Sequence, residues 1–487
     1  MAEHTSNKFS TSLQRFESIL TENEMAEMTA LQEQPLPIGI RLNSLTSNPE
    51  TAIFDLAARY GWQVQPIPFY EHGWTIQSAA QSPGTTIEHR MGRYYIQDGA
   101  SMVPVSLFEF KNPQPLILDM AASPGGKTTH LIDRTQDQGF ILANDSSKSR
   151  IPALRSVLTT WGGINQAITQ FPGESFGEWF PETFDAILLD APCSMENLRP
   201  TPNHPLRETT TDERTRLQNR QIQLLISGLQ SLKVDGQLVY ATCSLAPEED
   251  EAVINAVLTA YPHAFRIEDV SSKFTFSANG LGQFEDEIFH PELQHSLRLW
   301  PHRTGMSGFF CALVTKQISI PGTKTLPPNR DFAKTGLTLI SPEQQNTLAA
   351  QLADDYGIDL NTILQQFNLD VLQRNDMLFF IPLAYLKHFA SLPYEFIGLL
   401  LGKWLDNRLQ PSHEFVSRFG QMFTNGRIVI NESEVPQWIA GRDIRHPDTR
   451  LNPQGQYLMV SDAVGRNLGM GKLLSKRLRN LLPRKSI

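Results

Sequence analysis

The middle of the chain alternates short, almost wholly apolar runs with longer stretches in which apolar residues recur at helical spacing. Helical spacing is clear at residues 127–134 and 211–232, and a turn at 235–236 follows the second of these. Apolar runs of strand length lie at residues 116–119, 140–145, 165–169, 184–190, 237–242 and 308–314. Strands that are apolar on both sides and alternate with helices predict a mainly parallel sheet with helices on both faces. The predicted fold class is therefore α/β.

The same patterns divide the chain into five segments. Spacing typical of a helix fills residues 1–34, and strands at 40–45 and 93–97 bound a compact α/β region. Two smaller units follow the large sheet, behind a stretch rich in Pro, Thr and Gly that predicts a linker. The predicted segments are 1–112, the sheet at 113–316, the linker at 317–331, a small α/β unit at 332–393, and a unit of short strands at 394–487.

Composition adds a cellular context to this picture. The 487 residues are 40% apolar and 19% charged, and no run approaches the ~20 apolar residues of a membrane span. The N-terminus lacks the apolar region of a signal peptide, so we expect a cytoplasmic protein. Three cysteines without CxxC or zinc-type spacing predict free thiols and no metal site.

Charge is unevenly distributed. The net charge of −9 argues weakly against nucleic-acid binding, yet residues 466–487 hold basic side chains and no acidic one. This end of the chain is interpreted as a footprint for phosphates, and a plain solvated basic terminus is the alternative. The basic residues are Arg466, Lys472, Lys476, Arg477, Arg479, Arg484 and Lys485.

A Gly-rich loop at residues 119–129 lies between the first strand and the helix that it feeds. Glycines allow the backbone to approach a ligand closely, and a helix N-terminus offers free N–H groups. The spacing matches neither a Walker A loop nor GxGxxG. Asp145 ends the next strand about twenty residues further on, where an acid commonly binds ribose hydroxyls. Together these features predict a nucleoside-type cofactor.

Two cysteines follow the ends of later strands, where ligands of open α/β sheets bind. Cys193 follows Asp190 in DAPCS, and Cys243 lies in TCS, whereas Cys311 lies within an apolar run and reads as a buried structural residue. A thiolate added to carbon 6 of a pyrimidine makes carbon 5 nucleophilic, an acid near N3 stabilises the charge, and a base removes the carbon 5 proton. We assign these roles to Cys243, Asp190 and Cys193 in turn.

The residues around these positions resemble the RNA (cytosine-5) methyltransferase family. Residues 190–194 and 242–244 are similar to its two cysteine motifs, and 121–128 to its cofactor loop. The resemblance implies a Rossmann-like core that uses S-adenosylmethionine, with Cys243 as nucleophile and Cys193 as the base for product release. The cofactor-binding positions that it implies are Ala121, Ala122, Ser123, Pro124, Gly125, Gly126, Lys127, Asp145, Asp190 and, by position only, Pro172.

Segments outside the core narrow the resemblance to the bacterial RsmF branch. Residues 40–43 and 95–98 look like an N-terminal RNA-binding region, and 407–413, 441–443 and 468–472 are similar to the branch's C-terminal part. The resemblance implies a PUA-like RNA-binding domain at the C-terminus and small-subunit (16S) ribosomal RNA as partner, within the small ribosomal subunit. The protein is predicted to be an rRNA (cytosine-C5-)-methyltransferase that acts as a monomer, with no membrane association.

Three departures from the family pattern stand out. Pro172 occupies the position of an acid that contacts the cofactor, and Glu174 is a candidate to replace it. Met195 and Asn197 occupy the positions of two glycines after the first cysteine motif. A basic stretch is replaced at 199–205.

The sequence is also compatible with other functions. The same chemistry on another RNA, such as transfer RNA, is one. An RNA-binding ribosome assembly factor with weakened catalysis is another, and the altered residues 172, 195 and 197 motivate it. A methyltransferase of proteins or small molecules leaves the second thiol unexplained.

Overall fold

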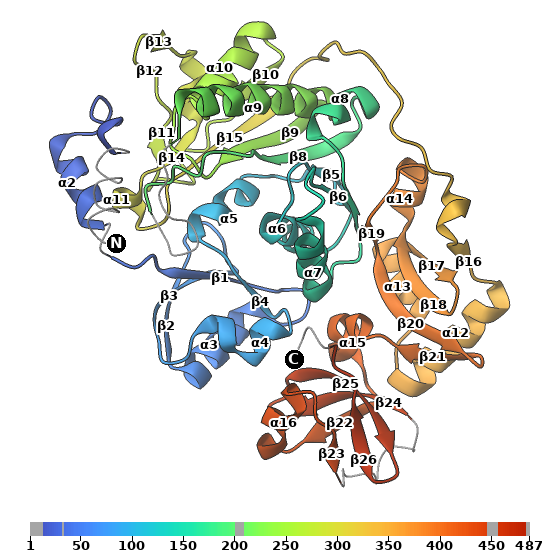
Figure 1. The fold of residues 1–487 in the computed structure, drawn as a ribbon. Helices are drawn as coiled ribbons and strands as arrows, with labels where there is room; N and C mark the ends of the chain where they lie inside the picture. Colours follow the sequence, from blue (N-terminus) through green and yellow to red (C-terminus); the bar gives the residue numbers. More distant parts are fainter. Residues whose placement is uncertain (1–12, 32–33, 200–208, 446–455, 484–487) are drawn as a thin grey trace.

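The computed structural model describes residues 13–31, 34–199, 209–445 and 456–483, and its centre is a ten-stranded sheet (Figure 1). Five neighbouring strands of this sheet are parallel: β9 (Leu232–Thr242), β8 (Phe184–Asp190), β5 (Leu116–Asp119), β6 (Phe140–Asn144) and β7 (Gln166–Thr169). Antiparallel strands extend it at both ends: β15 (Phe309–Lys316), β14 (Leu297–Leu299), β11 (Ala278–Asn279) and β10 (Phe265–Ile267) beside β9, and β19 (Phe396–Ile397) beside β7.

Helices cover both faces of this sheet, as the apolar strands predict. Side chains alternate across a strand, so Leu116 and Leu118 of β5 pack into one apolar core and Ile117 into the other. The first core also receives α8 (Phe176–Trp179), α9 (Thr211–Ser231) and α10 (Glu251–Ala260). The second receives α5 (Gly99–Ser106), α6 (Gly126–Arg134) and α7 (Ile151–Trp161). The arrangement confirms the predicted α/β, Rossmann-like core.

A small sheet in the order β2–β3–β1–β4 precedes the core. Its elements are β1 (Ile38–Leu42), α3 (Pro49–Tyr60), β2 (Trp62–Pro66), β3 (Gly73–Ala79), α4 (Ile87–Arg90) and β4 (Tyr94–Ile96). The helix predicted over residues 1–34 is wrong in extent. Residues 13–14 are helical, 15–20 form turns and a bend, α2 (Glu22–Leu31) is a separate helix, and 1–12 lie outside the described residues.

Two β-rich units follow the core. The first holds α12 (Pro342–Tyr356), α13 (Leu360–Phe367), α14 (Leu383–His388) and the sheet β16 (Thr338–Leu339), β17 (Leu369–Arg374), β18 (Met377–Pro382), β20 (Leu399–Leu405), β21 (Arg408–Pro411). The second holds α15 (His413–Phe419), α16 (Val435–Ile439) and the sheet β22 (Arg427–Ile430), β24 (Tyr457–Asp462), β25 (Asn467–Leu474), β26 (Arg477–Asn480), β23 (Ile444–Arg445). The expected division at residue 393 falls inside the first of these sheets.

Two further expectations differ from the structure. The pairing of β8 with β9 jumps from Phe184–Leu232 to Ala186–Gln237, so the expected turn at 235–236 is a bulge inside β9. The basic end of the chain is no loose tail, because most of residues 466–483 form β25 and β26, with 484–487 outside the described residues. Within the described ranges, no helix is long and apolar enough to cross a membrane.

Candidate functional site

The fold brings the two predicted catalytic cysteines together. Cys193 follows the end of β8 and Cys243 follows the end of β9, and these parallel strands are direct neighbours that pair Asp190 with Ala241. The two sulfur atoms lie 3.2 Å apart, and both side chains are half-buried. Cys311 is fully buried in β15, as its apolar surroundings predict.

The two thiols are not equivalent. The hydrogen bond with Cys243, together with burial, raises the pKa of the Cys193 thiol well above its ordinary value. The raised pKa favours the protonated form of Cys193, and at 3.2 Å either thiol can donate to the other.

Lys127 connects the Gly-rich loop to this pair. Its Nζ donates to Oδ2 of Asp190 over 2.8 Å and lies 5.2 Å from the centre of the Phe309 ring. Burial alone would lower the pKa of Lys127, but the charge of Asp190 and the hydrogen bond to it raise the value. Lys127, which is predicted to bind the cofactor, thus forms an ion pair with Asp190, which is predicted to act on the target cytosine.

The loop itself needs its glycines. Gly125 has φ of 113°, a conformation that L side chains rarely adopt. A Cβ atom on Gly126 would lie 2.8 Å from Cε1 of Tyr95. Asp145 holds the loop from the next strand, since its Oδ2 accepts from the Ser123 amide over 3.2 Å. Its Oδ1 accepts from the Ser147 amide over 2.9 Å.

Two buried polar atoms beside the loop have no partner among the described residues: Oδ1 of Asp119, at the end of β5, and Oγ of Ser123. Buried polar groups are normally hydrogen-bonded, so these atoms fit a polar ligand such as a nucleoside cofactor. Asp119 also accepts from Thr128 Oγ1 over 2.7 Å, and burial raises its pKa to about 7. Sequence reasoning passed over Asp119, although it is the last residue of β5 and Asp145 directly follows the neighbouring strand β6.

The structure also shows where Pro172 and Glu174 lie, at the first departure from the family pattern. Pro172 precedes the short 3-10 turn Gly173–Ser175 and offers no side-chain acceptor. The carboxylate of Glu174 accepts from Nε of Arg220 over 2.9 Å, and Arg220 also reaches Oγ of Ser146, which follows Asp145. Glu174 therefore lies on the rim beside Asp145, and its replacement of a cofactor acid stays a prediction.

The altered positions after Cys193 are held in place. Met195 adopts φ of 65°, which glycine would take without strain. The backbone oxygen of Asn197 accepts from the Gly308 amide over 2.8 Å. Between them, the carboxylate of Glu196 pairs with Arg15 at 3.0 Å and Arg214 at 2.5 Å. Residues 200–205 of the replaced basic stretch lie outside the described residues.

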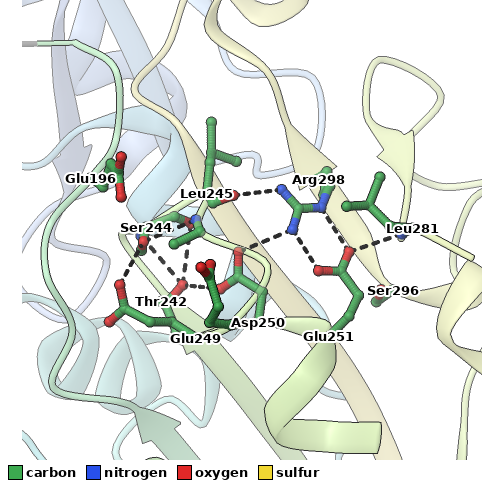
Figure 2. A network of polar contacts seen from close by, with 12 residues as sticks. Glu196, Thr242, Ser244, Leu245, Glu249, Asp250, Glu251, Leu281, Ser296 and Arg298 are labelled. Atoms are coloured by element: carbon green, nitrogen blue, oxygen red, sulfur yellow. Dashed lines mark hydrogen bonds and ion pairs between the residues drawn. The ribbon is translucent and has the colours of Figure 1, made fainter. Parts of the chain in front are cut away.

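Acidic residues after Cys243 form a second layer that sequence reasoning missed (Figure 2). Thr242 Oγ1 donates to Asp250 over 2.6 Å, and Arg298 donates from Nε to Glu251 over 2.7 Å. Arg298 also binds the backbone oxygen of Leu245 over 2.9 Å. In the described part of the chain, no group of three or more His, Cys, Asp or Glu side chains is placed to hold a metal.

Comparisons with known proteins match this architecture. The model of the family described as 16S rRNA methyltransferase RsmB/F matches residues 106–315, and that of the N-terminal domain of 16S rRNA methyltransferase RsmF matches 8–99. The ribosomal RNA small subunit methyltransferase F of Shewanella oneidensis is 32% identical, over 94% of this chain and 93% of its own. That of Vibrio cholerae is 31% identical, over 95% and 94%.

Solved structures agree at the level of the fold. A methyltransferase homolog protein from Pyrococcus horikoshii superposes with a TM-score of 0.54 at 29% identity, over 63% of this chain and 99% of its own. NSun6 from the same organism gives a TM-score of 0.52 at 20% identity, over 63% and 98%. By the whole-length relatives and the two family models, the chain belongs to the RsmB/F family of 16S rRNA methyltransferases.

Proposed function

We propose that the protein transfers a methyl group from S-adenosylmethionine to carbon 5 of a cytosine in 16S ribosomal RNA of the small subunit. The reaction passes through a covalent bond between Cys243 and carbon 6 of that cytosine. The observation that carries the proposal is the pair of thiols, 3.2 Å apart, at the ends of two neighbouring strands beside Asp190. Family membership supplies the RNA class.

The cofactor would be held by the loop at 121–127, with Asp119 and Asp145 from the two neighbouring strands. S-adenosylmethionine supplies the methyl group when it is bound. The chain's own residues prepare the base to receive it. Asp190 keeps Oδ1 free of partners in the described residues, because Lys127 takes only Oδ2, and Oδ1 is available to the cytosine ring.

The hydrogen bond between the thiols suggests an order of events. The Cys243 thiol loses its proton to solvent, and its sulfur attacks carbon 6 while Cys193 is still protonated. Once Cys243 is bound to carbon, the largest of the causes that raise the pKa of Cys193 is altered, and Cys193 then releases its proton to solvent. After carbon 5 has gained the methyl group, the Cys193 thiolate takes the proton from carbon 5. The bond between carbon 6 and the sulfur of Cys243 then breaks, its electron pair returns to that sulfur, and the methylated base leaves.

The test is transfer of labelled methyl from S-adenosylmethionine to small subunits that lack the modification, with wild type and Cys243→Ala compared. We expect label on carbon 5 of a cytosine for the wild type and none for the variant. Label on transfer RNA but not on small subunits would mean that transfer RNA, and not 16S ribosomal RNA, is the substrate. No label on any RNA would favour the assembly factor suggested by Pro172, Met195 and Asn197.

The rest of the proposal concerns the cellular location, the oligomeric state and the RNA-binding regions. The free thiols of the described structure fit a reducing compartment, so we place the protein in the cytoplasm. We propose that it acts as a monomer and that its C-terminal β-rich unit is a PUA-like RNA-binding domain. The small sheet near the N-terminus is proposed to bind RNA as well.

A further inference from the structure

A single buried carboxylate lies behind both cysteines. Glu249 is 0% exposed and precedes α10, and Figure 2 shows its carboxylate facing Ser244, the residue after Cys243. Its Oε2 accepts from the amide of Ser194 over 2.8 Å and from Nε2 of Gln221 over 3.1 Å. Its Oε1 accepts from the hydroxyls of Ser194 and Ser244, the latter over 3.1 Å.

The donors come from three different parts of the chain. Ser194 directly follows Cys193 and Ser244 directly follows Cys243, so one carboxylate binds both cysteine turns. Gln221, from α9, also donates to the backbone oxygen of Pro192 over 2.9 Å, on the other side of Cys193. The backbone oxygen of Glu249 is itself fixed by the Tyr240 hydroxyl, over 2.5 Å.

The chemistry of the donors requires an acceptor at this position. The backbone N–H of Ser194 and the Nε2 group of Gln221 can only donate, and both point at Oε2. An ionised carboxylate accepts on both oxygens and satisfies all of these groups without exposing a buried donor. An apolar side chain of the same size would leave the donors of both turns unpaired.

We propose that Glu249 is a positioning residue that holds the Cys193 and Cys243 turns together and so sets the spacing of the two thiols. The inference rests on the proposed function for its catalytic meaning, but the spacing itself is a property of the protein alone. Displacing a reacting group by about 1 Å can lower the rate about a hundredfold. A residue that sets the spacing of the two thiols therefore affects the rate of the reaction.

The same turn provides a matched control. Glu251 is equally buried, two residues along the chain, but its carboxylate faces Arg298 and the amide of Leu281. Among the described residues, Glu251 forms no hydrogen bond to either cysteine turn, whereas Glu249 contacts both. A general loosening of the fold would follow from changing either residue, and a change in thiol spacing only from changing Glu249.

The experiment measures thiol spacing by oxidation with diamide, which takes two hydrogens from a pair of thiols and leaves one disulfide. Cys311 is buried, so loss of two free thiols reports the Cys193–Cys243 pair. We expect Glu249→Leu to slow this loss at least about tenfold and to lower the rate of methyl transfer about a hundredfold. Affinity for S-adenosylmethionine should stay within about twofold, because the loop at 121–127 is unchanged.

Glu249→Gln is the conservative variant. Its amide oxygen can face the two N–H donors while its NH₂ group faces the two hydroxyls, which can accept. We expect its diamide reaction within about threefold of wild type. Glu251→Gln should lower the melting temperature but leave the diamide rate unchanged.

Three results would overturn the inference: a wild-type diamide rate in Glu249→Leu, equal slowing in Glu249→Gln and Glu249→Leu, or equal slowing in Glu251→Gln. Folding of each variant is checked by circular dichroism, so an unfolded variant is not counted as a slow one. The diamide assay uses neither RNA nor cofactor. Failure of the proposed function would therefore leave its result intact.

Discussion

The ammonium of Lys127 lies 2.8 Å from Oδ2 of Asp190, and this contact joins the first residues of α6 to the end of β8. Lys127 belongs to the Gly-rich loop, and Asp190 precedes the first cysteine. The lysine side chain is 12% exposed and the aspartate 28%, so the pair is only partly screened by solvent. Cofactor loop and catalytic turn are thus linked through a single ion pair.

Lys127→Met should therefore damage both stability and catalysis. Removing the ammonium leaves a mostly buried carboxylate unpaired, and we expect a loss of about 2 kcal/mol in the free energy of unfolding. The rate of methyl transfer should fall about a hundredfold, since Asp190 loses the partner that orients it. Urea denaturation and single-turnover kinetics measure the two effects. Lys111→Met, at an exposed lysine, is the control, and equal effects in both variants would contradict the role of the pair.

The two thiols predict opposite outcomes for two alanine variants. Cys193→Ala should methylate the base but fail to remove the carbon 5 proton, so protein and RNA stay covalently joined on a denaturing gel. Cys243→Ala should form no such adduct. If only Cys243→Ala forms an adduct, the assigned roles are reversed.

The chemistry-bearing residues of the core were predictable because each stands at the end of an apolar strand. Asp190, Cys193 and Cys243 carry this signal, and parallel strands bring their carboxyl ends to one edge. Their 3.2 Å spacing was not predictable, since it depends on the order of strands in the sheet and on buried side chains behind the turns.

The burial of Glu249 is the clearest example of what the sequence did not predict. The run 248–251 reads as an acidic, solvated helix start, yet three of its four side chains are 0% exposed. Their partners, Ser194 and Arg298, lie 55 positions before Glu249 and 47 after Glu251, so no local pattern reveals the burial. Long-range pairs of this kind decide which charges of a sequence are structural.

Arg41 corrects the interpretation of the N-terminal region in one respect. The arginine lies in a segment expected to bind RNA, but it is 0% exposed and donates to the Gly126 oxygen over 3.1 Å and to Gln97 over 3.1 Å. It also lies 4.4 Å from the Trp161 ring. Its charge therefore supports the start of α6 and is not available to a phosphate.

Arg41→Met should lower the free energy of unfolding by roughly 3 kcal/mol, because several buried acceptors lose a charged donor. The dependence of RNA affinity on salt should stay unchanged, since no phosphate contact is removed. Urea denaturation and filter binding over a salt series provide the two readings. A flatter salt dependence with unchanged stability would restore a direct RNA contact.

The raised pKa of Asp119 predicts that the free energy of unfolding depends on pH. Burial raises its pKa in the folded protein to about 7 from an ordinary 3.8, so the unfolded chain loses this proton first as pH rises. The contribution of Asp119 to stability is therefore present below pH 4 and is lost progressively between pH 4 and 7. Asp119→Asn has no carboxyl group at this position, so the variant does not lose this stability as pH rises. The unfolding free energy of the variant, relative to wild type, should rise by about 1.4 kcal/mol per pH unit across this window and level off above it. Urea denaturation at pH 4.5 to 8 measures this, and a difference that does not vary with pH would contradict the raised pKa.

The basic end of the chain divides into neutralised and open charges. Arg466 pairs with Glu432 at 3.2 Å and with Asp462, and its side chain is 12% exposed. Lys476 and Arg479 are exposed at the hairpin of β25 and β26, with no ion pair in the described residues. Only the exposed charges can release counterions when RNA binds.

Replacing Lys476 and Arg479 together with Gln should therefore reduce the slope of log affinity against log salt by about 1.4, at ~0.7 for each contact with single-stranded RNA. Arg466→Gln should leave that slope unchanged while it lowers the melting temperature, because it breaks ion pairs within the protein. Filter binding from 50 to 300 mM salt separates these outcomes. Equal slopes in the double variant and wild type would mean that this hairpin is a solvated surface, and RNA affinity would then have to come from other parts of the chain.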